Sequence, residues 1–370
     1  MTKTILLASV CALAFATTAA RADDYIDMAT KKATAATGRA DKWDGPTAGP
    51  KAAPGKNIVF VAGDLKNGGI LGASEGVKEA AKAAGWKVTV IDGQGTVSAR
   101  TAAMNQALTL KPDGIVVGGF DTKEQQVAFD AAARAGAIVV GWHSGTKPGP
   151  EPEAGIFANV TTSPQDVSET AAYQAIADSS GKAGVIIFTD TQYEIAVFKA
   201  RAMEAAIKKC GGCTVLEFVD SPIAESSQRM PQLTTTLLQK YGAKWTHSLA
   251  INDLYFDFMG PSLAAAGVKG DGAPKAISAG DGSESAFQRI RAKQYQAGTV
   301  PEPLNEQGWQ LVDELNRAFN KQPWSGFVSG IHLVTAGNVA YDGGPKNIFD
   351  PDNGYRDHYR AIWDVSRLEK

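Results

Sequence analysis

From Lys56 onward, short apolar stretches alternate with longer alanine-rich stretches, and successive apolar stretches begin about 25 to 30 residues apart. The strands predicted in the first half of the chain are 57–62, 86–91, 114–117 and 137–141, and the helices between them are 70–84, 97–110 and 123–135. Each helix carries the chain back to the starting edge of the sheet, so successive strands pair in parallel. The pattern therefore requires α/β units, with helices on both faces of a parallel sheet.

The same alternation repeats in the second half of the chain. The predicted strands are 184–188, 214–219, 246–251, 275–278 and 295–299, and the predicted helices are 163–177, 194–209, 225–241, 254–266, 283–293 and 304–320. A chain of 370 residues is long enough for two domains of ordinary size. We therefore predict two similar, doubly wound α/β domains.

The N-terminus has the composition of a secretory signal peptide. Residues 5–16 are almost entirely apolar or small, and Ala20-Arg21-Ala22 provides a small-x-small cleavage pattern. We expect a signal peptide at 1–22, cut after Ala22. Acylation at Cys11 is a less favoured alternative, because the residue before it suits a lipoprotein poorly. Residues 23–55 are rich in Ala, Thr, Lys, Gly and Pro, and are expected to form an N-terminal extension and linker.

Charge and motif content argue against several classes of function. The chain has 37 basic and 39 acidic residues, a net charge of −2, so it lacks the basic surface that nucleic-acid binding requires. Its four histidines are scattered without metal-ligand spacing, and we expect no metal and no other cofactor. Ser74 stands in a Gly-x-Ser-x-Gly sequence, but inside a predicted helix rather than at the strand-to-helix turn that a hydrolase needs.

Cys210 and Cys213 are the two cysteines that remain after removal of the signal peptide. A close, even pair in an oxidising compartment predicts a small structural disulfide. A redox role is disfavoured, because a redox Cys-x-x-Cys normally opens a helix, whose N-terminus lowers a thiol pKa, whereas this pair follows a predicted helix.

Carboxylates, amides and aromatic rings follow the predicted strands, at the edge where open parallel sheets bind ligands. Carboxylates accept hydrogen bonds from hydroxyl groups, and an aromatic face covers the C–H face of a sugar ring, so the set suits a small neutral polyhydroxylated ligand. For any single aspartate, capping of the turn is an equally good explanation. The candidate ligand-binding residues are Asp64, Lys66, Asn67, Phe120, Asp121, Trp142, His143, Asp190, Tyr193, Asn252, Asp253, Tyr255 and Asp281.

Several short segments occur in a familiar order after the secretion signal. They are 56–62 (KNIVFVA), 76–85 (GVKEAAKAAG), 111–117 (KPDGIVV), 250–253 (AIND) and 280–282 (GDG). In this order they resemble the type I periplasmic solute-binding proteins of ABC transporters, in the ribose/galactose-binding group. The resemblance implies a monomeric periplasmic receptor without enzymatic activity, which encloses its ligand between two domains joined by three crossing segments and delivers it to a membrane permease.

The resemblance also implies domain boundaries. It places the first domain at 56–160 plus 303–326 and the second at 161–302 plus 327–345, with the three crossings near 160–162, 300–303 and 326–330. It leaves 346–370 as a C-terminal extension that we expect to pack on the second domain.

Two departures from the family pattern concern charge. The arginine expected beside Asp121 is replaced by Thr122-Lys123, and where relatives carry a further arginine, at 195–199, only Lys199 is basic. A sugar or polyol is the favoured ligand. An aromatic or autoinducer-2-like solute, and a role in presenting ligand to a membrane signalling protein, stay open as alternatives.

Overall fold

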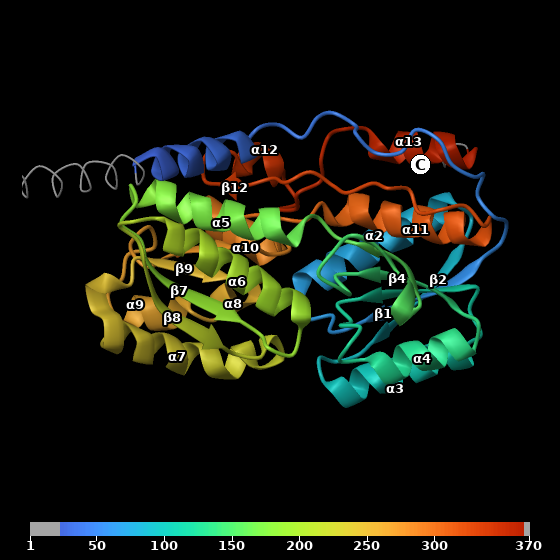
Figure 1. Ribbon diagram of the computed structural model, residues 1–370, viewed down its shortest axis with the longest axis horizontal. Helices are drawn as coiled ribbons and strands as arrows, with labels where there is room; N and C mark the ends of the chain where they lie inside the picture. Colours follow the sequence, from blue (N-terminus) through green and yellow to red (C-terminus); the bar gives the residue numbers. More distant parts are fainter. Residues whose placement is uncertain (1–22, 366–370) are drawn as a thin grey trace, which may run out of the picture.

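The computed structural model describes residues 23–365, which form two α/β domains, each built on a six-stranded sheet (Figure 1). The first sheet has the order β2-β1-β3-β4-β6-β5 and the second β12-β11-β10-β9-β7-β8. In each sheet one edge strand, β5 or β12, is antiparallel and the other strands are parallel. The predicted fold class, a type I periplasmic binding protein with two doubly wound domains, is confirmed.

The strands of the first sheet are β1 (Asn57–Ala62), β2 (Lys87–Asp92), β3 (Gly114–Gly118), β4 (Ile138–Trp142), β5 (Gly149–Glu151) and β6 (Ile156–Val160). Alternate side chains of these strands enter two separate cores, because successive residues point to opposite faces of a sheet. Phe60 and Val116 pack toward α2 (Gly68–Ala83) and α11 (Leu304–Phe319). The neighbouring strand residues pack toward α3 (Val97–Thr109) and α4 (Gln126–Arg134).

The strands of the second sheet are β7 (Gly184–Thr189), β8 (Thr214–Asp220), β9 (His247–Ala250), β10 (Lys275–Ser278), β11 (Gln296–Thr299) and β12 (Val334–Thr335). The helices around it are α5 (Pro164–Asp178), α6 (Glu194–Lys209), α7 (Ser226–Tyr241), α8 (Leu254–Asp257), α9 (Gly260–Ala265), α10 (Glu284–Ala292) and α12 (Val339–Asp342). Short 3-10 helices, η1 (Pro152–Ala154), η2 (Ile223–Glu225) and η3 (Gly242–Lys244), complete the connections, and α13 (Tyr355–Trp363) ends the described chain.

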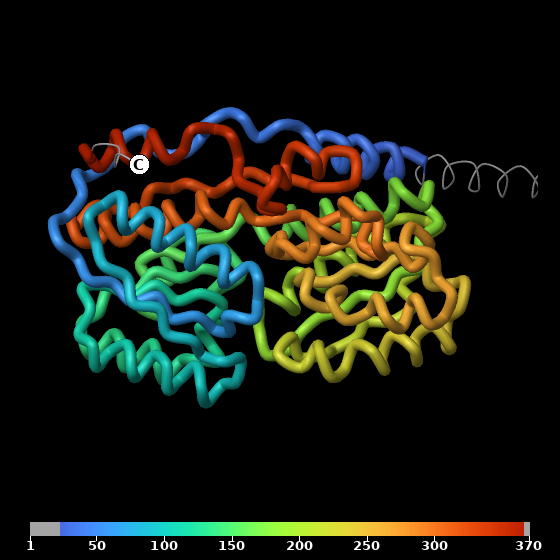
Figure 2. The backbone as a smooth tube through the Cα atoms, turned by 180° about the vertical axis from the view of Figure 1, so that it is seen from behind, coloured from blue at the N-terminus to red at the C-terminus, as the bar shows by residue number. Residues whose placement is uncertain are grey.

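Two terminal segments join the domains in addition to the three expected crossings. A helix at 23–36 packs on the second domain, where Tyr25 Oη donates to the carbonyl of Ala206, and the chain then runs along the molecule to the first domain (Figures 1 and 2). The C-terminal segment runs the same way, from α12 beside α10 to α13 beside α11. Trp43 links the two segments, because its ring stacks on His358 at 5.2 Å between centroids.

The structure differs from the sequence-based expectations at several places. The C-terminal extension was expected to pack on the second domain, but α13 packs on the first, where Trp363 stacks on Trp309 of α11. Strands β5 and β6 had no predicted counterpart, and the helix predicted at 254–266 is split into α8 and α9 ahead of Pro261. The predicted signal peptide, 1–22, lies outside the described residues, and the predicted domain boundaries stay predictions.

The predicted disulfide is present. Cys210 and Cys213 are bonded, with their Cα atoms 5.3 Å apart, in the turn between α6 and β8. Among residues 23–365, no helix is both long and apolar enough to cross a membrane.

Candidate functional site

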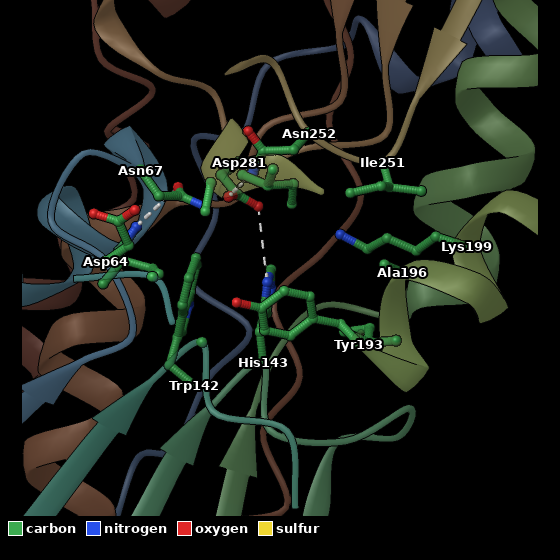
Figure 3. Close-up of a pocket in the computed structure, with 16 residues that line it drawn as sticks. Asp64, Asn67, Trp142, His143, Tyr193, Ala196, Lys199, Ile251, Asn252 and Asp281 are labelled. Atoms are coloured by element: carbon green, nitrogen blue, oxygen red, sulfur yellow. Dashed lines mark hydrogen bonds and ion pairs between the residues drawn. The ribbon is translucent and has the colours of Figure 1, made fainter. Parts of the chain in front are cut away.

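A pocket lies between the two domains, at the carboxyl ends of strands from both sheets (Figure 3). It contains about 620 Å³ of empty space, including the part that opens to solvent. Its lining residues are Asp64, Asn67, Ile70, Gly95, Gly119, Trp142, His143, Tyr193, Ile195, Ala196, Lys199, Ile223, Ala224, Ile251, Asn252 and Asp281.

The loop after β1 supplies Asp64 and Asn67. Asn67 is the N-cap of α2, and its Oδ1 accepts a hydrogen bond from the backbone N–H of Gly69 at 2.9 Å. Asp64 Oδ1 accepts from the backbone N–H of Lys66 at 3.0 Å. The cap therefore fixes the loop and leaves the other carboxylate oxygen of Asp64, and the Nδ2 group of Asn67, available to a ligand.

The end of β4 supplies a stacked pair of rings. Trp142 and His143 lie 3.9 Å apart between centroids with 8° between their planes. Trp142 Nε1 donates to Oε1 of Gln307 at 2.7 Å, which fixes the indole. His143 has a left-handed backbone (φ 55°), an uncommon conformation for a residue other than glycine, and it directs the imidazole into the pocket.

From the second domain, Asn252 and Asp281 follow β9 and β10. Asn252 Nδ2 donates to Asp281 Oδ2 at 2.6 Å. The N-terminus of α2, in the first domain, meets the carboxylate of Asp281 directly, and only a glycine fits at position 69, because a Cβ there would overlap Asp281. The two domains are therefore in contact around the pocket, in a closed arrangement.

His143 lies between two buried carboxylates. Its Nε2 is 3.2 Å from Oε1 of Glu302, and its Nδ1 is 3.7 Å from Oδ1 of Asp281. Burial raises the pKa of Asp281, and the charges of His143 and Lys199 oppose that rise. Burial also disfavours the charge of Glu302, but the charge and hydrogen bond of His143 outweigh it and lower the pKa of Glu302 to about 2. These interactions tie the cleft to a crossing segment, because Glu302 also accepts from Thr162 Oγ1 at 2.6 Å.

Tyr193 and Lys199 reach the pocket from the start of α6 (Figure 3). Tyr193 Oη accepts a hydrogen bond from Arg100 of the first domain at 2.6 Å, so this phenol also links the domains. Lys199 is 3 % exposed, and its ammonium group points into the pocket.

Six of the thirteen predicted site residues lie outside the pocket. Lys66 lines a separate surface depression, and Phe120 is fully buried in the core of the first domain. The other four are buried and hydrogen-bonded to the protein: Asp121 accepts from the backbone N–H of Glu194, Asp190 from that of Ile223, Asp253 from that of Gly282, and Tyr255 donates to the carbonyl of Ser221. The seven that the structure brings together are Asp64, Asn67, Trp142, His143, Tyr193, Asn252 and Asp281.

The pocket also contains residues outside the predicted set. Four isoleucines line it: Ile70 of α2, Ile195 of α6, Ile223 of η2 and Ile251 directly after β9. Apolar side chains at such positions carry no sequence signal of a binding role. Lys199 does carry a sequence signal of a binding role. A lysine in the second turn of a helix that faces the cleft must find a partner or stay hydrated.

Comparison with known families identifies the chain. A family model described as "Periplasmic binding protein domain" matches residues 58–323, which is most of the chain. The chain belongs to the periplasmic binding protein family. No curated protein sequence matches it significantly.

Solved structures of the same fold align with this chain over nearly all of their own length. An ABC transporter solute-binding protein from Agrobacterium vitis with bound allitol has a TM-score of 0.66 at 18% identity, covering 77% of this chain and 97% of that one. A glucose-galactose binding protein from Geobacillus stearothermophilus has a TM-score of 0.67 at 19% identity, covering 77% and 99%. The periplasmic binding component of an arabinose ABC transporter from Shewanella sp. ANA-3 has a TM-score of 0.67 at 14% identity, covering 85% and 100%.

Membership has consequences for activity and location. Periplasmic binding proteins are solute receptors rather than enzymes, they act in the periplasm, and they work with ABC transporter permeases. Within the described part of this periplasmic binding protein, no group of three or more His, Cys, Asp or Glu residues is placed to hold a metal ion.

Proposed function

We propose that this protein captures a sugar, a polyol or a related small hydroxylated solute in the pocket between its domains and delivers it to an ABC permease. The observation that carries the proposal is the composition of the pocket wall. Two carboxylates and two amides, Asp64, Asp281, Asn67 and Asn252, face the same space as the stacked rings of Trp142 and His143. Carboxylates and amides bind hydroxyl groups, and an aromatic edge or face covers C–H groups.

Capture by domain closure follows from the origin of these groups. Asp64 and Asn67 belong to the first domain, and Asn252 and Asp281 to the second. A ligand that bonds to both sets has more contacts with the closed form than with the open one, so it shifts the population toward closure. The closed form then presents a single surface, made by both domains, to the permease.

A thermal-shift screen tests the proposal. Binding to the folded protein raises its melting temperature by mass action. We expect a polyol, sugar or sugar derivative to raise it, and we expect simple aromatic acids and amino acids of similar size to have no effect. Stabilisation by aromatic acids, with none by any hydroxylated compound, would replace the proposal with the alternative of a non-sugar receptor.

Calorimetry on a pocket variant then tests the site. Asp281→Asn keeps the shape of the side chain and removes its charge, and we expect it to weaken binding of the best compound by about tenfold or more. Thr191→Val, in an exposed loop of the same domain outside the pocket, is the control and should bind as the wild type does.

A further inference from the structure

We infer that the ligand carries a carboxylate, and that this group binds to the ammonium of Lys199. The inference rests on the proposed function and narrows it: among hydroxylated solutes, the geometry points to sugar acids, such as aldonates or uronates, rather than neutral sugars or polyols.

Lys199 is a buried charge that makes no direct ion pair or hydrogen bond within the described residues, and the charges of Asp281 and Glu302 act on it only from farther away. Its side chain is 3 % exposed and points into the pocket (Figure 3). Among residues 23–365, no side chain or carbonyl lies within hydrogen-bond or ion-pair distance of its ammonium group. A buried ammonium without acceptors is unfavourable, so acceptors supplied by a ligand stabilise it.

The surroundings of Lys199 make a charged acceptor more effective than a hydroxyl group. The pocket residues closest to it along the chain, Ile195 and Ala196, are apolar, and Ile251 lies beside it in Figure 3. A salt bridge in such a poorly solvated region is stronger than the same pair in water. An ammonium is also a compact point charge, which a single carboxylate oxygen neutralises without the planar match that a guanidinium requires.

The carboxylates in and next to the pocket differ from Lys199 in their contacts. Glu302 is paired with His143 and hydrogen-bonded to Thr162. Asp281 accepts from Asn252 and lies near the other nitrogen of His143. Asp64 is partly exposed and lies on the opposite side of the pocket from Lys199 (Figure 3). Lys199 is therefore the charge in the pocket that lacks a direct contact. Asp281 and Glu302 attract it from farther away, and both are engaged by His143.

The arrangement predicts how the ligand lies. Its hydroxyl groups face Asp64, Asn67, Asn252 and Asp281, and its carboxylate faces Lys199 on α6. A chain or ring with hydroxyl groups at one end and an acid group at the other matches both sides of the pocket, whereas the corresponding neutral compound leaves the ammonium with only weak acceptors.

Matched pairs of compounds test the inference by calorimetry on the wild-type protein. The pairs are gluconate with glucitol, galactonate with galactitol, mannonate with mannitol, and galacturonate with galactose. We expect at least one acid to bind about tenfold or more tightly than its neutral partner. We expect Lys199→Met, which keeps the length of the side chain and removes its charge, to weaken binding of that acid by about 100-fold, and Lys199→Arg to retain part of the affinity.

Unliganded stability separates loss of a contact from loss of folding. Lys199→Met removes a buried charge that has no direct ion pair but is attracted by Asp281 and Glu302, so its melting temperature without ligand should stay close to that of the wild type. Lys209→Met, an exposed position in the last turn of the same helix, is the control and should bind as the wild type does. If a neutral compound binds as tightly as its acid, or if Lys199→Met keeps the affinity for the acid, the inference is overturned and the proposed function stands. If no compound of either kind binds, the proposed function fails together with the inference.

Discussion

Glu306 is a buried carboxyl group at a junction of three chain segments. It belongs to the first turn of α11 and is 3 % exposed. Its oxygens accept from Ser329 Oγ, in the third crossing, at 3.1 Å and from Asn353 Nδ2, in the C-terminal segment, at 2.7 Å. Burial raises the pKa of Glu306 to about 7, against the effect of these two hydrogen bonds.

This raised pKa makes stability depend on pH near neutrality. The folded chain holds the proton of Glu306 more tightly than the unfolded chain, so the contribution to stability is complete below pH 4.5 and is lost as pH rises through about 7. We expect the free energy of unfolding to fall by up to about 3 kcal/mol from this group between pH 5 and pH 8. The side chain of Glu306→Gln stays neutral at every pH. The free energy of unfolding of this variant, measured by chemical denaturation, should therefore fall less between pH 5 and pH 8 than that of the wild type.

The control for this prediction is an exposed glutamate at a similar position. Glu284 also lies in the first turn of a helix, α10, but is exposed. Glu284→Gln should keep the pH dependence of the wild type. An unchanged pH dependence in Glu306→Gln would show that other groups, such as the buried Glu314, cause it.

At the scale of single residues, the sequence alone could locate the site but could not select its members. Asp121, Asp190 and Asp253 follow strands just as Asp64 and Asp281 do, but both carboxylate oxygens of each accept hydrogen bonds from the protein. A turn-capping aspartate and a ligand-binding aspartate share the same local sequence pattern. The difference depends on how the second domain approaches the first, which no local pattern encodes.

Among the elements, α2 determines how closely the domains approach. Gly69, in its first turn, contacts Asp281 of the second domain, and Gly68 contacts Ser283. A helix N-terminus favours a nearby carboxylate, because its unpaired N–H groups carry partial positive charge. The closed arrangement therefore brings a ligand-binding carboxylate against the positive end of a helix.

Gly69→Ala tests whether this contact limits closure. A Cβ at position 69 would overlap Asp281, but only when the domains are closed. We expect the unliganded protein to be as stable as the wild type or slightly more so, since alanine favours helix by up to about 1 kcal/mol. We expect ligand affinity to fall by about tenfold or more, because a less populated closed state lowers the apparent affinity directly.

A second glycine provides the comparison. Gly260 begins α9, and a Cβ there would meet only ring atoms of Tyr295 at an ordinary 3.6 Å. Gly260→Ala should leave affinity unchanged in the same calorimetric titration. Equal affinity of Gly69→Ala and wild type would mean that the domains need not approach as closely as they do in this structure.

The elements themselves were largely predictable. Helix α6 and strand β10 have the predicted bounds, because long apolar periodicity and short apolar runs are strong local signals. Strand β6 pairs in parallel with β4, but the alternation of strands and helices does not predict it. It follows the antiparallel strand β5 through a hairpin-like turn, and no α-helix separates it from β4. The break between α8 and α9 follows from Pro261, which lacks the N–H that a continuous helix requires.

On the scale of the whole molecule, the terminal segments add two connections between the domains to the three predicted crossings. Trp43 contacts Phe327 of the third crossing, with ring centroids 5.3 Å apart, and Tyr359 of α13 at 5.4 Å. The terminal segments therefore bind each other as well as the domains. Both terminal segments lie outside residues 58–323, which the family model matches.

Trp43→Ala should loosen the N-terminal segment. Removing a half-buried indole is expected to cost about 1 to 3 kcal/mol, most of it from the contacts with α13 and the third crossing. In limited digestion with trypsin, the variant should be cut faster after Arg39, Lys42 and Lys51 than the wild type. Lys66→Ala, an exposed change in the first domain, should not alter digestion in this segment. Equal digestion rates for Trp43→Ala and wild type would mean that the segment is held by other contacts.

The position of α13 has a consequence for the order in which the chain can fold. Tyr355, Tyr359 and Trp363 are buried in the same core as Phe60 and Trp309. Although every pocket residue precedes position 282, the core that supports half of the pocket is completed only by the last described helix. During synthesis and export, the core of the first domain therefore cannot be complete until α13 has emerged, although most of this domain is made before the second. We expect a chain truncated after residue 350 to contain every pocket residue but to lack a stable first domain.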